Sequence, residues 1–546
     1  MNSEEAPHVV ETPGGLSVRY RGRLLYSERD PARLPRRTAL SADPGPARLL
    51  LVCSPLLWYG LPELLQRAGP GSVALCVEAD PSLARLSREK APPGLLDDPR
   101  VVFLEARDAE EAVSRARSLG SFRSCSRLDL SGAASLNAGL YARMASLLSA
   151  EIESLWRSRA ALTVFGRLWA RNIMDNIAAL PELELRAFPR FEGPAVICGA
   201  GPSLEEALPF IAANRERISV LACDTALGPM LTEGVKPDLV VCLEAQIHNL
   251  ADFVPLGRTA MPLAADLSSH PASFRALHGP KHLSFVRLAP SPFLGRVAAL
   301  GSALGLPWLE LPPLGSVGVH AAYLARSLAS GPLFATGLDF SFEVGKTHAR
   351  GSPSLLAEER RLERLCRWPG QYAVSFRTRT TWAPCPALGD GRRLLSDPIL
   401  LSYATLLREV SGGSGPALYD IRGRGPDIGA RPIGLGQAAA LLGGEARSLP
   451  GPALAPRPPD LRVGLASFLE EELLRLDRLT AALKGRSTHP ESDLAGLLAN
   501  SDYLYWSFPD AERAGALPQD FLNRLLPEIE YWSWRLRALA ASLPRD

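Results

Sequence analysis

The stretch Ala195-Val-Ile-Cys-Gly-Ala-Gly-Pro-Ser-Leu-Glu-Glu206 decides the fold of the central part of the chain. An apolar run leads into glycines at Gly199 and Gly201, and helix-compatible residues begin at Ser203. This order predicts a buried strand, a tight turn and the start of a helix. Ser203 and Glu206 also have the spacing of a capping box.

A turn of this kind predicts an anion site, because the free amides and the dipole of the helix's first turn favour negative charge. Ser203 could contact a phosphate or only cap the helix. The loop has Leu204 where a dinucleotide fingerprint needs a third glycine, and it lacks the Gly-Lys-Ser/Thr of a Walker loop. We expect a nucleotide phosphate to be held by Gly199, Gly201, Pro202, Ser203 and Leu204.

Further apolar runs at 218–223, 239–243, 283–286 and 333–336 alternate with helix-length segments. This alternation predicts a parallel sheet in a central domain at 191–440. Polar residues that follow such strands face the ligand crevice. Asp224 could bind ribose, hold a metal or only cap a helix. The other expected ligand-facing residues are Thr225, Glu244, Gln246, Gly315 and Ser316, with His248 and Asn249 nearby.

The segment 337–348 combines an acid, a cation, a hydroxyl and an imidazole at Asp339, Lys346, Thr347 and His348. Such a set could bind a metal-phosphate and supply a proton-transfer group, or it could be a solvated polar loop. Asp224 and Asp339 are the metal-ligand candidates. Arg377 and Arg379 could join this site from a distant loop.

The first 150 residues predict a hairpin near 15–26 and a second α/β domain, with strand-like runs at 48–53, 73–77 and 101–104. This domain resembles the architecture of S-adenosylmethionine-dependent methyltransferases, in which an acid such as Glu78 would bind ribose. The turn at 53–60 lacks the glycines that admit a ligand, so a degenerate Rossmann-like scaffold is the preferred interpretation.

Helical spacing predicts a connector at 151–190, where Asn172 and Asn176 share one face. They could hydrogen-bond the domain interface or a ligand, and interface packing is the preferred interpretation. A Pro/Gly-rich stretch at 441–460 predicts a linker, and amphipathic patterns predict a helical region at 461–546. The predicted fold is therefore α/β, with Rossmann-like parallel sheets in two domains and a C-terminal helical region.

The bulk composition excludes several classes of protein. A formal net charge of +2 gives no general attraction to nucleic acid, so no nucleic-acid partner is expected. No apolar run approaches the roughly 20 residues that span a bilayer, and no membrane span is expected. The eight cysteines form no metal-ligand spacing, which favours a reducing cytoplasm.

The ordered motifs at 198–204, 224–226, 234–238, 315–317, 337–339 and 345–348 together resemble the 6-hydroxymethylpterin diphosphokinase MptE-like family, which includes the Maf motility accessory factors of flagellin glycosylation. The segments 25–31 and Trp169-Ala-Arg-Asn172 are similar to its longer bacterial members. The glycine loop is also similar to that of bacterial sialyltransferases that use CMP-activated sugars, except that Ala200 replaces an asparagine.

This resemblance implies a transferase with a nucleotide donor, and the extra domains favour Maf-type transfer of a CMP-activated nonulosonic acid sugar to flagellin Ser/Thr. His348 and then His320 are the implied general bases. The alternative is a 6-hydroxymethylpterin pyrophosphokinase that uses ATP and Mg²⁺, to which Asp224, Glu244 and Asp339 could bind. A non-enzymatic nucleotide-binding or scaffold protein is a second alternative.

Overall fold

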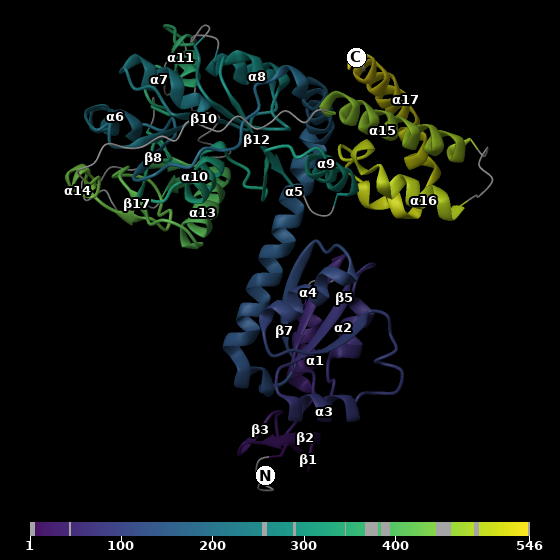
Figure 1. The fold of residues 1–546 in the computed structure, drawn as a ribbon. Coiled ribbons are helices and arrows are strands. Elements are labelled where there is room, and N and C mark those ends of the chain that lie inside the picture. The colour runs from purple at the N-terminus through teal and green to yellow at the C-terminus, as the bar shows by residue number, and fades with distance from the viewer. Residues whose placement is uncertain are drawn as a thin grey trace. The chain divides into compact units, whose positions relative to one another are not determined.

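A computed structural model describes most of the chain, which separates into two compact units, Met1–Thr163 and Val164–Asp546. Both contain parallel sheets and the second also contains a C-terminal helical region, so the predicted fold class is confirmed (Figure 1). Arg377 and Arg379 and nearly all of the expected linker lie outside the described residues. The described ranges are 6–42, 45–253, 259–287, 291–343, 346–365, 381–383, 394–443, 460–484 and 491–543.

Unit 1 contains a four-stranded parallel sheet in the order β6-β5-β4-β7. Its apolar strands are buried between α2 (Leu61–Arg67) on one side and α4 (Ala109–Leu119) with the start of α5 (Ala138–Ala179) on the other. An antiparallel sheet of β1 (His8–Thr12), β2 (Gly15–Tyr20) and β3 (Arg23–Leu24) precedes it. The parallel strands are β4 (Arg48–Cys53), β5 (Val73–Glu78), β6 (Val101–Glu105) and β7 (Ser124–Asp129).

Unit 2 is built on a nine-stranded sheet in the order β13-β12-β11-β10-β9-β8-β14-β17-β18, in which neighbouring strands pair in parallel. The chain builds outward from β8 to β13 and then returns to the other side of β8. The strands are β8 (Ala195–Cys198), β9 (Ser219–Cys223), β10 (Leu239–Cys242), β11 (Leu263–Asp266), β12 (Lys281–Val286), β13 (Leu309–Leu311), β14 (Leu333–Thr336), β17 (Leu418–Asp420) and β18 (Arg431–Pro432).

The central strands of this sheet are apolar on both faces because helices cover both. One face packs against α10 (Val317–Leu328) and α13 (Pro398–Gly412), with residues such as Ile197 and Val241 in the shared core. α6 (Ser203–Ala213) follows β8, and α7 (Leu227–Thr232) follows β9. Buried parallel strands of this kind place ligand-facing loops at their carboxyl ends.

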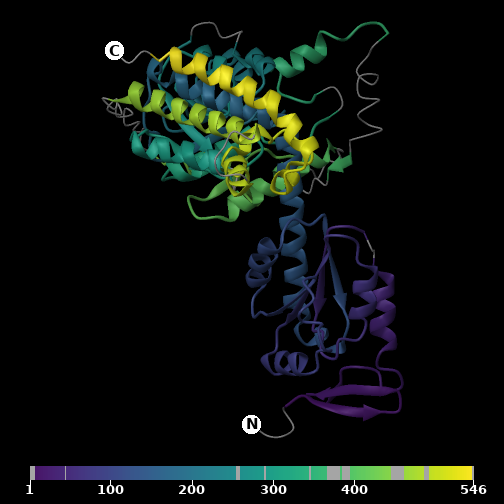
Figure 2. The ribbon, with the colours of Figure 1, turned by 90° about the vertical axis from the view of Figure 1, so that its right-hand side faces the viewer.

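Residues 151–179 of the predicted helical connector belong to one 42-residue helix, α5 (Ala138–Ala179), and the rest of the connector lies beyond its end. Within unit 2 it packs against α17 (Gln519–Ala541), where Arg167 lies over the Tyr531 ring and Asp175 pairs with Arg535. α15 (Leu461–Leu483) and α17 lie side by side in both views, with α16 (Glu491–Asn500) against α15 (Figures 1 and 2). Among the described helices, none combines the length and apolar character needed to cross a bilayer.

Candidate functional site

The strand order of unit 2 reverses between β8 and β14, which is where α/β sheets hold their ligands. The two loops that leave these strands touch closely: the Gly199 and Gly201 amides donate to Thr336 O (2.9 Å) and Gly337 O (2.7 Å). A Cβ on Gly199 would lie 2.3 Å from Gly337 O. The glycines therefore allow two segments of the chain to meet.

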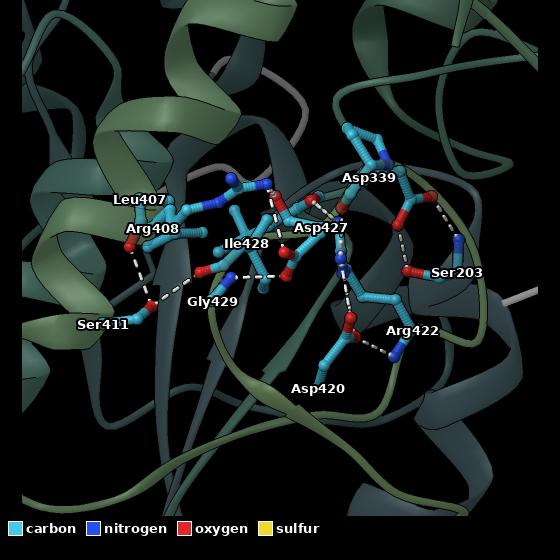
Figure 3. A network of polar contacts seen from close by, with 12 residues as sticks. Ser203, Asp339, Leu407, Arg408, Ser411, Asp420, Arg422, Asp427, Ile428 and Gly429 are labelled. Atoms are coloured by element: carbon cyan, nitrogen blue, oxygen red, sulfur yellow. Dashed lines mark hydrogen bonds and ion pairs between the residues drawn. The ribbon is translucent and has the colours of Figure 1, made fainter. Parts of the chain in front are cut away.

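An anion does lie at the first turn of α6, and it is the carboxylate of Asp339. Ser203 N donates to Asp339 Oδ2 (2.8 Å), and Ser203 Oγ donates to Asp339 Oδ1 (Figure 3). Ser203 Oγ also accepts from Gly337 N (2.8 Å). The predicted capping box is wrong, since Pro202 is the N-cap and Glu206 pairs with Arg424. The prediction of free amides at this turn is also wrong, because the Gly201 amide donates to Gly337 O and the Ser203 amide donates to Asp339.

Asp339 is a buried structural carboxylate. Burial raises its pKa, whereas the Ser203 bonds and the charges of Arg422 and Arg424 oppose that rise. Arg422 is itself buried, donates to Leu338 O (2.7 Å) and pairs with Asp420 (2.7 Å), as Figure 3 shows. Both Asp339 oxygens accept from Ser203, which argues against the expected metal site with Asp224. No group of three or more metal-binding side chains occurs among the described residues.

The polar residues after β14 do not form the expected single cluster. Lys346 pairs with Glu205 (3.0 Å), Thr347 Oγ1 donates to Glu358 (3.0 Å), and His348 Nδ1 lies 3.1 Å from Thr347 Oγ1. The Ala349 amide donates to Ala200 O (2.7 Å), so this segment crosses the glycine loop and places His348 beside it. Burial lowers the pKa of the half-buried His348, which keeps its ring neutral.

His320 has no exposed surface and lies between α10 and the sheet, where its Nε2 is 3.3 Å from Ser284 Oγ. Burial lowers its pKa to about 4, so the ring is neutral at neutral pH. Its Nδ1 has no hydrogen-bond partner in the described structure. Complete burial favours a structural role over contact with an acceptor substrate, so His348 is the better placed of the two histidines.

Acidic side chains gather beyond β9 and β10. Thr225 N donates to Asp224 Oδ1 (2.9 Å), and Thr225 Oγ1 donates to Asp252 Oδ2 (3.3 Å). Burial, together with the charges of Asp252 and Glu244, raises the pKa of Asp224 to about 7. Burial raises the pKa of Asp252 to about 6 and also raises that of Glu244. Asp252 was missed in the sequence because it lies ten positions beyond the end of β10, within the short helix η4 (Ile247–Asp252).

These raised pKa values predict how stability depends on pH. Between about pH 4 and pH 7 the folded protein keeps protons on Asp224 and Asp252 that the unfolded chain has released. The free energy of unfolding should therefore fall as the pH rises through this window. Asp224→Asn should flatten the fall, as measured by denaturant midpoints from about pH 5 to about pH 7.5. An unchanged slope in this variant would assign the titration to other groups.

The first turn of α10 differs from that of α6. Ser316 is its N-cap and makes no side-chain cap bond, and within the described structure no group accepts from the amides of Val317, Gly318 and Val319. Gly315 precedes them with a φ of +67°, and a Cβ there would lie 3.3 Å from the Tyr403 ring. Burial and then the Glu244 charge raise the pKa of Tyr403. The two predicted residues Gly315 and Ser316 thus border amides that have no acceptor among the described residues.

The corresponding edge of the unit 1 sheet is filled by the chain's own residues. Tyr26 Oη donates to Pro55 O (3.1 Å) and accepts from Leu57 N (3.1 Å), and Gly132 N donates to Leu25 O (2.7 Å). Glu78 is fully buried, where it accepts from Ser54 Oγ and from the next two backbone amides. These contacts favour the scaffold interpretation of this domain.

Comparison with known proteins finds a family that resembles the central part of unit 2. Residues 171–345 match the family described as 6-hydroxymethylpterin diphosphokinase MptE-like. This segment therefore resembles an MptE-like domain. It spans β8 to β14 and contains the glycine loop, the acids and the start of α10. The family resemblance expected from the sequence is therefore confirmed for this segment.

The fold around the MptE-like domain also has a solved counterpart. The structure of MAf glycosyltransferase from Magnetospirillum magneticum AMB-1 superposes with a TM-score of 0.54 and 14% identity, covering 99% of this chain and 92% of that one. An uncharacterised protein of Treponema pallidum (strain Nichols) is 29% identical over 569 residues, 98% of this chain and 96% of its own. A second uncharacterised Treponema pallidum protein is 29% identical over 123 residues, 21% of this chain and 56% of its own.

Proposed function

We propose that the chain is a transferase with a nucleotide-activated donor, and that the donor phosphate binds at the first turn of α10. The observation that carries this proposal is that the amides of Val317, Gly318 and Val319, beside Gly315, have no acceptor among the residues that the structure describes. Unpaired first-turn amides and the helix dipole attract phosphate. At the equivalent turn of α6, the Ser203 amide already donates to Asp339, so this turn has fewer free amides for a phosphate.

Glycosyl transfer is the reaction we favour, from a CMP-linked nonulosonic acid sugar to Ser/Thr of flagellin. The fold shared with a protein described as a glycosyltransferase supports the class of reaction, and the MptE-like domain supports a nucleotide-type donor. His348 is the proposed general base, because a neutral imidazole can accept the proton of an acceptor hydroxyl. Its partial exposure distinguishes it from the buried His320.

The reaction is tested by incubating the protein with flagellin and a CMP-activated sugar and weighing the flagellin by mass spectrometry. A mass increment equal to one or more sugars is expected, together with release of CMP. His348→Ala should lower the rate and spare donor binding, as judged by the donor's shift of the melting temperature. The absence of any increment with every donor offered would remove glycosyl transfer to flagellin.

The family description favours one alternative, transfer of pyrophosphate from ATP to a hydroxymethylpterin. Such a reaction uses Mg²⁺, for which oxygen ligands must converge. The described acids do not form a metal-binding group of three, and Asp339 is engaged by Ser203. Release of AMP that depends on the pterin would support this alternative over glycosyl transfer.

The phosphate site is tested by Val317→Pro, which removes one amide hydrogen from the first turn of α10. Proline suits the first position of a helix, and Ser316 before it has a compatible extended backbone (φ −138°, ψ 137°). We expect the helix to form and donor affinity to fall by about tenfold, or about 1.4 kcal/mol. The measurement is the concentration of CMP or donor needed to raise the melting temperature.

A matched control is Leu435→Pro, which places proline at the first position of α14 (Leu435–Ala440) after an extended Gly434. This variant should bind the donor as the wild type does. Wild-type affinity in Val317→Pro would place the phosphate elsewhere. If CMP, CTP, AMP and ATP all fail to shift the wild-type melting curve, the nucleotide-donor proposal fails as a whole.

A further inference from the structure

Two asparagines of α5, Asn172 and Asn176, are almost completely buried, with exposed fractions of 0% and 1%. They lie four positions apart and so share one face of the helix. Burying a carboxamide is unfavourable unless its polar atoms are hydrogen-bonded. Both residues belong to unit 2, and the proposed reaction assigns them no role.

Each asparagine uses its amide nitrogen to hold two backbone carbonyls. Asn172 Nδ2 donates to Ala245 O (3.0 Å) and Ser268 O (2.9 Å). Asn176 Nδ2 donates to Leu267 O (2.8 Å) and Ser269 O (2.8 Å). Both amide hydrogens of each side chain are therefore engaged, and each of the four carbonyls gains a donor, in buried bonds at Ala245, Leu267 and Ser269.

The carbonyls belong to the two segments that leave β10 and β11 at the carboxyl edge of the sheet. The first segment carries Glu244 and Gln246, and the two segments are tied together by His270 N, which donates to Glu244 O (2.9 Å). The second is also held by Asp266, whose Oδ1 accepts from Ser268 N (2.8 Å). The asparagines fix the side of these segments that faces α5.

The Oδ1 atom of Asn172 is buried and has no hydrogen-bond partner among the described residues. An unsatisfied buried acceptor is unfavourable, so Asn172 contributes less to stability than its two bonds suggest. The two hydrogen bonds of Asn172 are therefore better explained as a way to fix the segments that they hold than as a gain in stability. The segment after β10 also carries Glu244, whose charge raises the pKa values of Asp224 and Tyr403.

We infer that Asn172 and Asn176 are positioning residues, which hold segments 244–249 and 267–269 in the conformation that binds the donor. We call the four hydrogen bonds from Asn172 and Asn176 to the backbone carbonyls the clamp. The identity of the ligand in this inference rests on the proposed function, whereas the clamp itself does not. A side chain that cannot donate would release the carbonyls and let both segments move. Loss of such positioning lowers affinity and rate even when the fold remains intact.

The clamp is tested by Asn172→Asp and Asn176→Asp, which keep the shape of the side chain but place carboxylate oxygens against carbonyls. Hydrogen exchange without ligand should quicken at the amides of 244–250 and 267–270 and stay unchanged in β8, β9 and β14. Asn500→Asp is the control. Asn500 Nδ2 also donates to a backbone carbonyl, Gly496 O of its own helix (2.9 Å), but Asn500 is exposed. Asn172→Ala provides a milder second variant if the aspartates fail to fold.

Ligand binding provides the second readout, with CMP as the probe. We expect Asn172→Asp to need about tenfold more CMP for the same rise in melting temperature, while Asn500→Asp matches the wild type. Faster exchange across the whole sheet, or wild-type exchange in the two segments, would overturn the inference. If CMP and the other nucleotides fail on the wild type, the proposed function fails, and the exchange data still decide the clamp.

Discussion

Replacing Gly199 with alanine should destabilise unit 2 by about 3 kcal/mol or more. The new Cβ would lie 2.3 Å from Gly337 O and 2.6 Å from Leu338 Cδ2. The first of these is a backbone atom. Gly337 has a φ of +67°, and a Cβ on Gly337 would lie 2.0 Å from Gly199 O, so the two glycines are tightly packed against each other. Neither segment can withdraw without breaking the bond from Gly199 N to Thr336 O. Calorimetric unfolding measures the loss.

The matched control is Gly295→Ala in α9 (Pro292–Ala303). A Cβ on Gly295 meets nothing within 4 Å, and alanine is the better helix former by about 0.5–1 kcal/mol. This variant should therefore unfold at the same temperature or slightly higher. If Gly199→Ala keeps wild-type stability and loses only nucleotide binding, the glycine provides space for a ligand and the packing explanation is wrong.

The alternation of apolar runs and helices was enough to predict the α/β class and the strands on either side of the switch point. The strands that the sequence did not reveal lack a long apolar run: β11 (Leu-Ala-Ala-Asp), β13 (Leu-Glu-Leu) and the mostly polar β7 (Ser-Cys-Ser-Arg-Leu-Asp). Such sequences carry no pattern that separates a strand from a loop. The places of β11 and β13 in the sheet depend on pairing with β10 and β12, which a single segment does not encode.

The candidate site was predicted less completely than the fold, because a glycine loop of this kind can bind either a phosphate or a carboxylate of the chain itself. The loop at 199–204 was predicted to hold a phosphate, but a sequence does not distinguish a phosphate from a carboxylate that lies 136 residues later. Asp339 is that carboxylate. The first turn of α10 follows Gly315 and Ser316, which were predicted to face a ligand, and its amides have no acceptor among the described residues.

The C-terminal region shows the same limit for a charged residue. The pattern Phe468-Leu-Glu-Glu-Glu-Leu-Leu-Arg-Leu476 predicts an amphipathic helix, and its three glutamates would all be assigned to solvent. In the structure Glu472 is buried with an exposed fraction of 0%. Its partner, Arg296 of α9, is distant in sequence, so periodicity alone could not reveal the pair.

Glu472→Gln should destabilise unit 2 by about 3 kcal/mol, the second large effect that we expect. Glu472 Oε1 and Oε2 accept from Arg296 Nε (2.5 Å) and Nη2 (2.9 Å), and Arg475 lies 3.4 Å away. The glutamine keeps the shape but turns an amide toward the guanidinium, which leaves a largely buried cation without its counter-charge. Chemical denaturation of the two proteins measures the difference.

The control for this loss lies on the same helix. Asp477 pairs with Arg537 at 3.6 Å, and both side chains are more than half exposed. Exposed pairs contribute about 0–1 kcal/mol because water and salt screen them, so Asp477→Asn should change the unfolding free energy little. Equal losses in both variants would mean that helix propensity or net charge, and not burial of the pair, sets the stability of α15. A loss confined to Glu472→Gln would show that this buried ion pair anchors the C-terminal helices to α9.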